Sequence, residues 1–211
     1  SPSARARSTL TLLHLEQDRG CTAATRNVRL AAIHALVRFI GQHSPLHAQW
    51  CSEICTIPLK KTSPPAVTYL DKNEMDALLN APDRGTPQGQ RDFALLLFLY
   101  NTGARADEAA TLTISSLQGP TPHVKILGKG RKVRICPLWS LTTRILHPLT
   151  IGRDPGEPVF LNRLKHRMTR FGVTSLVKRH WRRVCLQNPA QRDKRVGAHT
   201  IRHTTAVHLL R

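Results

Sequence analysis

One apolar run near the middle of the chain constrains the fold more than any other feature. Residues 93–100 are Phe-Ala-Leu-Leu-Leu-Phe-Leu-Tyr, with no charged side chain among them. A helix formed by such a run is apolar on every side and has to be buried. The run is much shorter than the roughly eighteen residues of a membrane-spanning helix. It therefore predicts a buried helix over residues 91–101, ended by Gly103.

The upstream region, residues 8–55, is expected to be helical. One of its helices is amphipathic, because apolar residues recur at the 3.6-residue period of a helix face. We expect Gly41 and Pro45 to break this helix. Residues 56–67 form a proline-rich polar connector, and a domain boundary is expected there. The apolar face consists of Leu30, Ile33, Leu36, Val37 and Ile40.

The region after the connector starts with a helix signal. Asp71 is a good N-cap residue, and Glu74 stands three positions later, so the two make a capping box. A further helix is expected to begin near Ala104 and to include Glu108. Helices are expected again from about residue 141.

A strand pattern interrupts these helices. Residues 124–127 and 132–135 alternate polar and apolar side chains on either side of the glycine-rich turn 128–131. This pattern predicts a β-hairpin with Lys129 at its tip.

The predicted fold class is therefore mainly α with a small antiparallel β-hairpin, an α+β arrangement. We expect a helical N-terminal domain over residues 1–60, a linker over residues 61–67 and a second domain over residues 68–211.

The charge of the chain is strongly positive and uneven. The formal net charge of +19 points to a polyanionic partner. Residues 163–202 contain twelve Lys or Arg and a single acid, Asp193. Such a run is often only a solvated face or a flexible tail, but apolar residues between the charges favour a folded surface that contacts nucleic acid. Trp181 is expected to pack there rather than stack on a base. The expected contacts with the nucleic-acid backbone are Lys178, Arg179, Arg182 and Arg183.

The cysteine content and the start of the chain bear on its compartment. Five cysteines are an odd number and do not suggest a disulfide framework. The first residues lack the long apolar segment of a secretory signal. We expect a cytoplasmic protein without a membrane anchor, and the missing initial Met suggests a fragment.

Four residues at structural landmarks suit a bound phosphate. Arg105 follows a helix break at Gly103, Lys129 is at the hairpin tip, and His199 and Arg202 share one face at the start of the last helix. Two guanidinium groups can clamp phosphate oxygens and stabilise charge that develops at phosphorus. A lysine on a hairpin can donate a proton to a leaving oxygen.

These residues lie in three motifs that together resemble one family. Thr102-Gly103-Ala104-Arg105-Ala106-Asp107-Glu108 resembles the T-G-x-R-x-x-E segment of the tyrosine recombinases, the phage-integrase family. Residues 128–132, Gly-Lys-Gly-Arg-Lys, resemble its hairpin motif, and residues 199–203, His-Thr-Ile-Arg-His, resemble its H-x-L-R-H box. The order and spacing of the motifs also resemble the family, from about Tyr69 onward. The first 60 residues resemble part of the family's helical core-binding domain.

The resemblance implies a role for each motif residue. Arg105 and Arg202 would bind the scissile phosphate, and Lys129 would protonate the leaving 5′ oxygen. His199 would support proton transfer or hydrogen-bond the phosphate. Glu108 would support Arg105. Lys132 and Arg134 of the hairpin would contact DNA. His203 is a second supporting residue, expected as a core histidine with a local hydrogen bond.

The resemblance also implies an activity. The family cuts and rejoins double-stranded DNA through a 3′-phosphotyrosine, without a metal or nucleotide cofactor, and its members assemble as tetramers on two duplexes. The family's nucleophilic tyrosine lies beyond the last box, whereas Tyr69 and Tyr100 both precede the first. We therefore expect the nucleophile to be missing from this chain. Two hypotheses remain open: part of an active recombinase, or a catalytically inactive fragment or decayed copy that occupies recombination sites.

Metal-dependent alternatives have weaker support. His199 and His203 are spaced as in a zinc metalloprotease, but Thr200 stands beside His199 where that motif has glutamate. No carboxylate cluster suits the Mg²⁺ of a nuclease. A zinc site is conceivable on four residues spaced by four, although Pro45 interrupts their helix. These four are His43, His47, Cys51 and Cys55.

Overall fold

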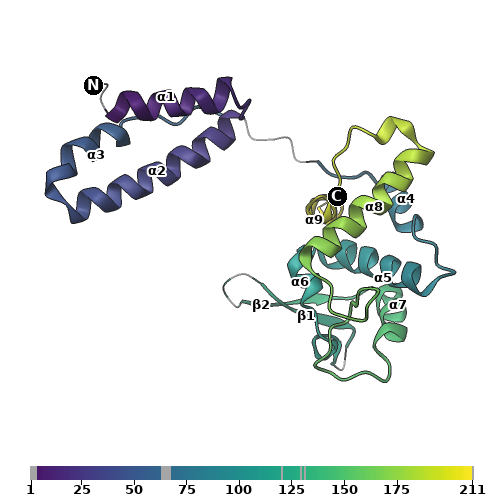
Figure 1. Cartoon of the computed structure of the whole chain (residues 1–211). Helices are drawn as coiled ribbons and strands as arrows, with labels where there is room; N and C mark the ends of the chain where they lie inside the picture. Colours follow the sequence, from purple (N-terminus) through teal and green to yellow (C-terminus); the bar gives the residue numbers. More distant parts are fainter. Residues whose placement is uncertain (1–3, 63–67, 120, 129, 131, 211) are drawn as a thin grey trace. The chain divides into compact units, whose positions relative to one another are not determined.

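The computed structural model describes residues 4–62, 68–119, 121–128, 130 and 132–210. The chain divides into two compact units, residues 1–65 and 66–211 (Figure 1). Each unit has its own hydrophobic core. In the described part of the chain, no helix combines the length and apolarity needed to cross a membrane.

Over its described residues, 4–62, the first unit consists of three helices around a small core. The helices are α1 (Ala4–Gln17), α2 (Ala23–His43) and α3 (Ala48–Cys55), and the short 3₁₀ turn η1 (Pro45–His47) joins the last two. The hydroxyl of Thr22 caps α2 by accepting a hydrogen bond from the amide of Thr25. The core residues are Leu12, Leu30, Val37, Cys51, Ile54 and Ile57.

Two details of α2 correct the sequence-based expectation. Gly41 does not break the helix, which continues to His43 and ends just before Pro45. A Cβ at Gly41 would lie only 3.3 Å from Cys51 Cβ, so the missing side chain lets α3 approach α2 closely here. Leu36 is 59% exposed. It lies about 100° around the helix from the buried Val37, beyond the face that α1 and α3 cover.

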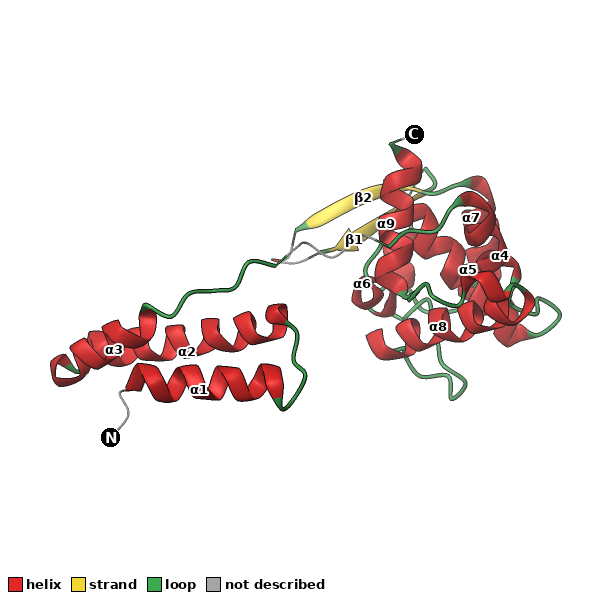
Figure 2. Cartoon of the chain, turned by 90° about the horizontal axis from the view of Figure 1, so that it is seen from above, coloured by secondary structure: helices red, strands yellow, loops and turns green. Residues whose placement is uncertain are grey.

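The second unit surrounds one buried helix, as the apolar run predicts. Helix α5 (Pro87–Thr102) contains the run, and every side chain from Asp92 to Tyr100 is buried. Helices α4 (Lys72–Asn80), α7 (Ser140–Thr150) and α9 (Ala198–Leu209) all pack on α5 (Figure 2). The helix begins four residues before the expected position, because Thr86 caps it and Pro87 fits the first turn.

The remaining helices of the unit lie beside this group. Helix α6 (Ala106–Ala110) packs on α8 (Arg170–Gln187), and two short 3₁₀ turns are η2 (Ile114–Leu117) and η4 (Pro189–Gln191). The predicted capping box of α4 is present, with hydrogen bonds exchanged between Asp71 and Glu74.

The predicted hairpin is also present. Strands β1 (His123–Leu127) and β2 (Val133–Pro137) form a two-stranded antiparallel sheet in which Ile126 pairs with Arg134 and Leu127 with Val133. Val124 and Ile126 point into the core. In the part of the chain that the structure describes, the fold is mainly helical with one small antiparallel sheet, which confirms the predicted class.

Candidate functional site

The corner between α5 and α6 places Arg105. Gly103 ends α5 in the left-handed region, with φ of 58°, a conformation that favours glycine. Thr102 braces the turn: its hydroxyl donates to the carbonyl of Phe98 at 2.7 Å and accepts from the amide of Ala104 at 3.2 Å. Arg105 is consequently the N-cap residue of α6, which begins two residues after the expected position.

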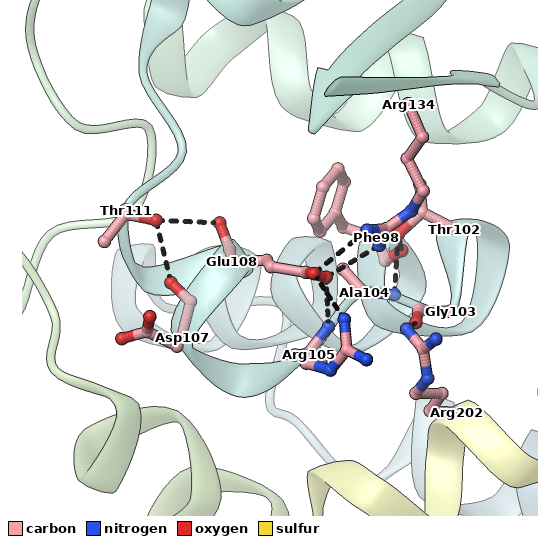
Figure 3. Close-up of polar contacts among 10 residues, drawn as sticks. All are labelled: Phe98, Thr102, Gly103, Ala104, Arg105, Asp107, Glu108, Thr111, Arg134 and Arg202. Atoms are coloured by element: carbon pink, nitrogen blue, oxygen red, sulfur yellow. Dashed lines mark hydrogen bonds and ion pairs between the residues drawn. The ribbon is translucent and has the colours of Figure 1, made fainter. Parts of the chain in front are cut away.

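Glu108 is the central acceptor of this corner (Figure 3). Its carboxylate is nearly buried and accepts four hydrogen bonds. The amide and Nη1 of Arg105 donate to it at 2.8 and 2.9 Å, and Nη1 and Nη2 of Arg134 donate at 2.9 and 2.6 Å. Burial alone would raise the pKa of Glu108, but the hydrogen bonds from Arg134 and Arg105 outweigh burial and lower it to about 2. Glu108 is thus a carboxylate at any working pH.

The last helix brings the second arginine to the same corner. Arg202 Nη1 donates to the carbonyl of Gly103 at 2.6 Å (Figure 3). The hydroxyl of Thr205 donates to the carbonyl of Tyr100 at 2.8 Å. Helix α9 is therefore tied to the C-terminal turn of α5. Burial lowers the pKa of Arg202, and so does the nearby positive charge of Arg105. Both arginines border the same cavity.

His199 stands one turn before Arg202 and is exposed. Burial lowers its pKa, and so do the charges of His203, Arg202 and Arg105. The imidazole is accordingly kept neutral near pH 7, with one nitrogen able to donate and one able to accept a hydrogen bond. His203 is half-buried, and its ring centroid lies 4.5 Å from that of His199 in an edge-on arrangement. The supporting role expected for His203 stays a prediction, and its half-buried ring contacts that of His199.

Three predicted residues line one cavity. Arg105, His199 and Arg202 border a space of about 580 Å³. Helix α8 contributes Phe171 and Lys178 to the same wall. The cavity is bordered by three arginines, a lysine and an imidazole against a single acid, so it suits a phosphate group. The third arginine is Arg170, and the acid is Asp107.

The other predicted residues fall in different places. Lys129 lies outside the described residues. Lys132 is exposed at the end of the hairpin turn. Arg134 directs both terminal nitrogens at Glu108. Trp181 is 4% exposed and donates to the carbonyl of Lys194 at 3.1 Å, which confirms its expected packing role. The exposed basic residues of α8 include Lys178, Arg179, Arg182 and Arg183.

Sequence reasoning missed two ion-pair networks. Asp92, on the buried run's helix, is 2% exposed and contacts Arg91, Arg179 and His180. Burial would raise the pKa of Asp92, but these partners lower it. The sequence signal that could have indicated this network is the carboxylate of Asp92 directly beside the apolar run, because a buried charge needs partners. The pairing of Glu108 with Arg134 joins residues 26 apart and has no signal in the spacing.

The residues of the alternative hypotheses have local partners. His43 Nδ1 donates to the carbonyl of Phe39, and His47 Nδ1 contacts the hydroxyl of Ser44, both at 2.8 Å. Among the residues that the structure describes, no three His, Cys, Asp or Glu side chains are grouped as a metal site requires. The hydroxyl of Tyr100 is hydrogen-bonded to His208 at 2.8 Å, and burial raises its pKa.

Known proteins resemble this chain over nearly its whole length. Residues 68–211 match the model of the phage integrase family. The putative integrase/recombinase y4rD of Sinorhizobium fredii is 36% identical, covering 90% of this chain and 69% of its own length. The putative integrase/recombinase y4rC of the same organism is 35% identical, covering 93% and 60%. Tyrosine recombinase XerC of Pelotomaculum thermopropionicum is 27% identical, covering 94% and 65%. The chain thus spans about two thirds of the length of these relatives.

Solved structures share the fold. The Tn1549 transposon integrase in complex with a circular intermediate DNA matches 99% of this chain and 73% of its own, with a TM-score of 0.75 and 17% identity. The XerH site-specific recombinase bound to a palindromic difH substrate matches 96% and 61%, with a TM-score of 0.70 and 21% identity. The family match, the relatives and the shared fold agree with the three motifs: the chain belongs to the phage integrase family of tyrosine recombinases.

Proposed function

We propose that the intact protein is a site-specific recombinase that cuts and rejoins double-stranded DNA through a 3′-phosphotyrosine. The observation that carries the proposal is the cavity bordered by Arg105, His199 and Arg202. These groups come from two helices that are far apart in the sequence and meet at the α5–α6 corner. The positive charges of the two guanidinium groups complement the negative charge of a phosphodiester.

A specific side chain is assigned to each step of the proposed reaction. A tyrosine oxygen attacks phosphorus and gives up its phenol proton to His199 or to solvent. The bond to the 5′ oxygen breaks, and Lys129 supplies the proton to that oxygen. Arg105 and Arg202 stabilise the charge on the non-bridging oxygens, which is greatest in the transition state. His199 hydrogen-bonds the phosphate or assists proton transfer. The reverse attack by a new 5′ hydroxyl rejoins the strand, so the phosphodiester's energy is conserved in the covalent intermediate.

The proposed nucleophile is a tyrosine outside these 211 residues. Tyr100 is unsuited, because its ring is buried and its hydroxyl is bonded to His208. We assign DNA-backbone contacts to Lys132 of the hairpin and to α8, with Lys178, Arg179, Arg182 and Arg183. The N-terminal unit would act as the DNA clamp, and the intact protein would assemble as a tetramer on two duplexes.

Covalent trapping tests this proposal. The complete gene product is incubated with nicked DNA carrying its recombination site, and the protein–DNA complex is measured on a denaturing gel. We expect Arg202→Ala to lower complex formation at least about a hundredfold. Arg182→Ala, a control on the proposed backbone surface, should mainly weaken binding and be rescued by more protein. Full activity of Arg202→Ala would refute the active-site assignment, and loss of activity in EDTA would favour a metal-dependent nuclease.

The second candidate is a DNA-binding fragment without catalysis. It is favoured by the buried, hydrogen-bonded state of Tyr100. The 211-residue chain should then bind duplex DNA with steep salt dependence and form no covalent complex by itself. A covalent complex formed by this chain alone would exclude that candidate.

A further inference from the structure

We propose that Arg134 is a positioning residue for Arg105, acting through Glu108, and that it does not contact the DNA backbone. The inference rests on the proposed function, because it assigns Arg105 to the phosphate. It also revises the sequence-based expectation that Arg134 is a DNA contact.

The contact geometry supports this role first. Nη1 and Nη2 of Arg134 donate to Oε1 and Oε2 of Glu108 at 2.9 and 2.6 Å, so the guanidinium and the carboxylate meet in the parallel two-bond arrangement. The same two oxygens accept from the side chain and the amide of Arg105. A carboxylate offers about four acceptor positions, so Glu108 is saturated and fixed by these partners.

Burial makes the second arginine necessary. The side chain of Glu108 is only 5% exposed, whereas those of Arg105 and Arg134 are 49% and 33% exposed. A nearly buried carboxylate is costly unless it is paired and hydrogen-bonded. Arg134 is the less exposed partner and takes most of that role. Arg105 is left with an exposed guanidinium edge that borders the cavity.

The net charge of the cluster also supports a positioning role for Arg134. Arg105 and Glu108 alone would cancel, and the pair would attract a phosphate weakly. With Arg134 included, the cluster has two cations and one anion, so a net positive charge remains. Arg134 therefore lets Glu108 orient Arg105 without neutralising it.

The position of Arg134 also links this cluster to the hairpin. Arg134 lies in β2 opposite Ile126, two residues after the turn. A Cβ at Gly128 would lie 3.6 Å from both Arg134 Nη1 and Glu108 Oε1, so the ion pair lies directly under the start of the turn. The start of the hairpin turn at Gly128 thereby lies against an ion pair that α6 shares with β2.

A double-mutant cycle with inorganic phosphate tests the proposal on the 211-residue chain. Binding is followed by the NMR shift of the His199 ring. We expect Arg134→Ala to weaken phosphate binding about tenfold in the wild-type background. In an Arg105→Ala background the same change should have less than about a twofold effect, because its target is absent. Arg134→Lys, which keeps the charge and loses the two-bond arrangement, should fall between wild type and Arg134→Ala.

Two further measurements complete the test. The Glu108 carboxyl is titrated by NMR, and Arg134→Ala should raise its pKa from about 2 toward the ordinary value. Arg144→Ala, at an exposed position of α7 outside this cavity, should change neither the phosphate affinity nor that pKa. If Arg134→Ala does not fold, Arg134→Lys and the double variant Glu108→Gln/Arg134→Ala replace it, since the latter buries no unpaired carboxylate.

Two results would overturn the proposal. An equal loss of phosphate affinity in both backgrounds would show that Arg134 acts on the anion directly. No loss in the wild-type background would show that Arg105 needs no support from Arg134. Failure of the proposed function would instead appear as absent covalent trapping with the complete gene product, while the phosphate cycle would still report on Arg134.

Discussion

The two halves of the site hold their arginines by different means. In the α6 half, Arg105 and Arg134 share the nearly buried carboxylate of Glu108. In the α9 half, Arg202 is held by the neutral carbonyl of Gly103, and His199 is exposed beside His203. The α6 half is therefore an ion-pair cluster that also stabilises the fold. In the α9 half, no carboxylate among the residues that the structure describes pairs with Arg202, so its positive charge can attract a ligand. Variants should affect the two halves differently.

The largest effect is expected for removal of the shared carboxylate. Glu108→Ala leaves two arginines without their acceptor and removes four hydrogen bonds at once. We expect a loss of about 3 kcal/mol in the free energy of unfolding, measured with urea.

The matched control is Glu157→Ala. Glu157 also pairs with an arginine, Arg153, but its side chain is 42% exposed. Exposed pairs contribute little, so the expected loss is much smaller than that of Glu108→Ala. Equal losses of unfolding free energy for the two variants would show that the buried ion pairs of Glu108 stabilise the fold no more than an exposed pair does.

Acid should weaken the same half. Because the fold lowers the pKa of Glu108 to about 2, its stabilising contribution is complete above the unfolded pKa of about 4.3 and is lost as the pH falls toward 2. Between pH 6 and pH 3, this carboxylate should account for a loss of about 2 kcal/mol. Urea unfolding of wild type and Glu108→Gln isolates the contribution, since the glutamine does not titrate. Parallel pH profiles of the two proteins would contradict the lowered pKa.

A smaller effect is expected where the two halves join. Gly103 adopts φ of 58°, and its carbonyl accepts from Arg202. Gly103→Ala should cost about 1 kcal/mol, because alanine is strained there, while its Cβ would have ordinary contacts of 3.6 Å or more. It should also weaken phosphate binding, by shifting the corner that carries Arg105.

Gly152→Ala separates backbone strain from site geometry. Gly152 has φ of 72° and open space around its missing Cβ. We expect a similar cost of about 1 kcal/mol with unchanged phosphate affinity. Unchanged affinity in Gly103→Ala as well would show that the corner does not couple the two halves.

The sequence predicted the fold well where one local signal decides an element. The apolar run marks α5, the Asp71–Glu74 pair marks the start of α4, and alternation marks the hairpin. The sequence-based prediction failed where the packing of a neighbouring helix determines the local structure. Gly41 was expected to break α2, but it is where α3 packs closely. Leu36 was likewise predicted to lie on the buried apolar face of α2, but α1 and α3 do not cover it and it is exposed.

The site shows the same division. The motifs identified Arg105, His199 and Arg202, because the residue types and spacings suit a phosphate. They did not show that Arg134 pairs with Glu108, or that Arg179 and His180 meet at Asp92. Such pairs depend on where strands and helices pack, which a single sequence does not specify. Arg134 and Arg179 are both predicted from the sequence to contact DNA, although each also pairs with a buried carboxylate.

The smallest effect on stability is expected in the α9 half. His199 is exposed, so His199→Asn should change the free energy of unfolding by less than about 0.5 kcal/mol while weakening phosphate binding. The control is His208→Asn on the same helix, which loses a 2.8 Å hydrogen bond and an edge-on ring contact with Tyr100 and should cost about 1 kcal/mol. A loss at His199 as large as that at His208 would show that this ring stabilises the fold. The α9 half would then resemble the α6 half, and the separation between a stabilising cluster and a ligand-binding pair would no longer hold.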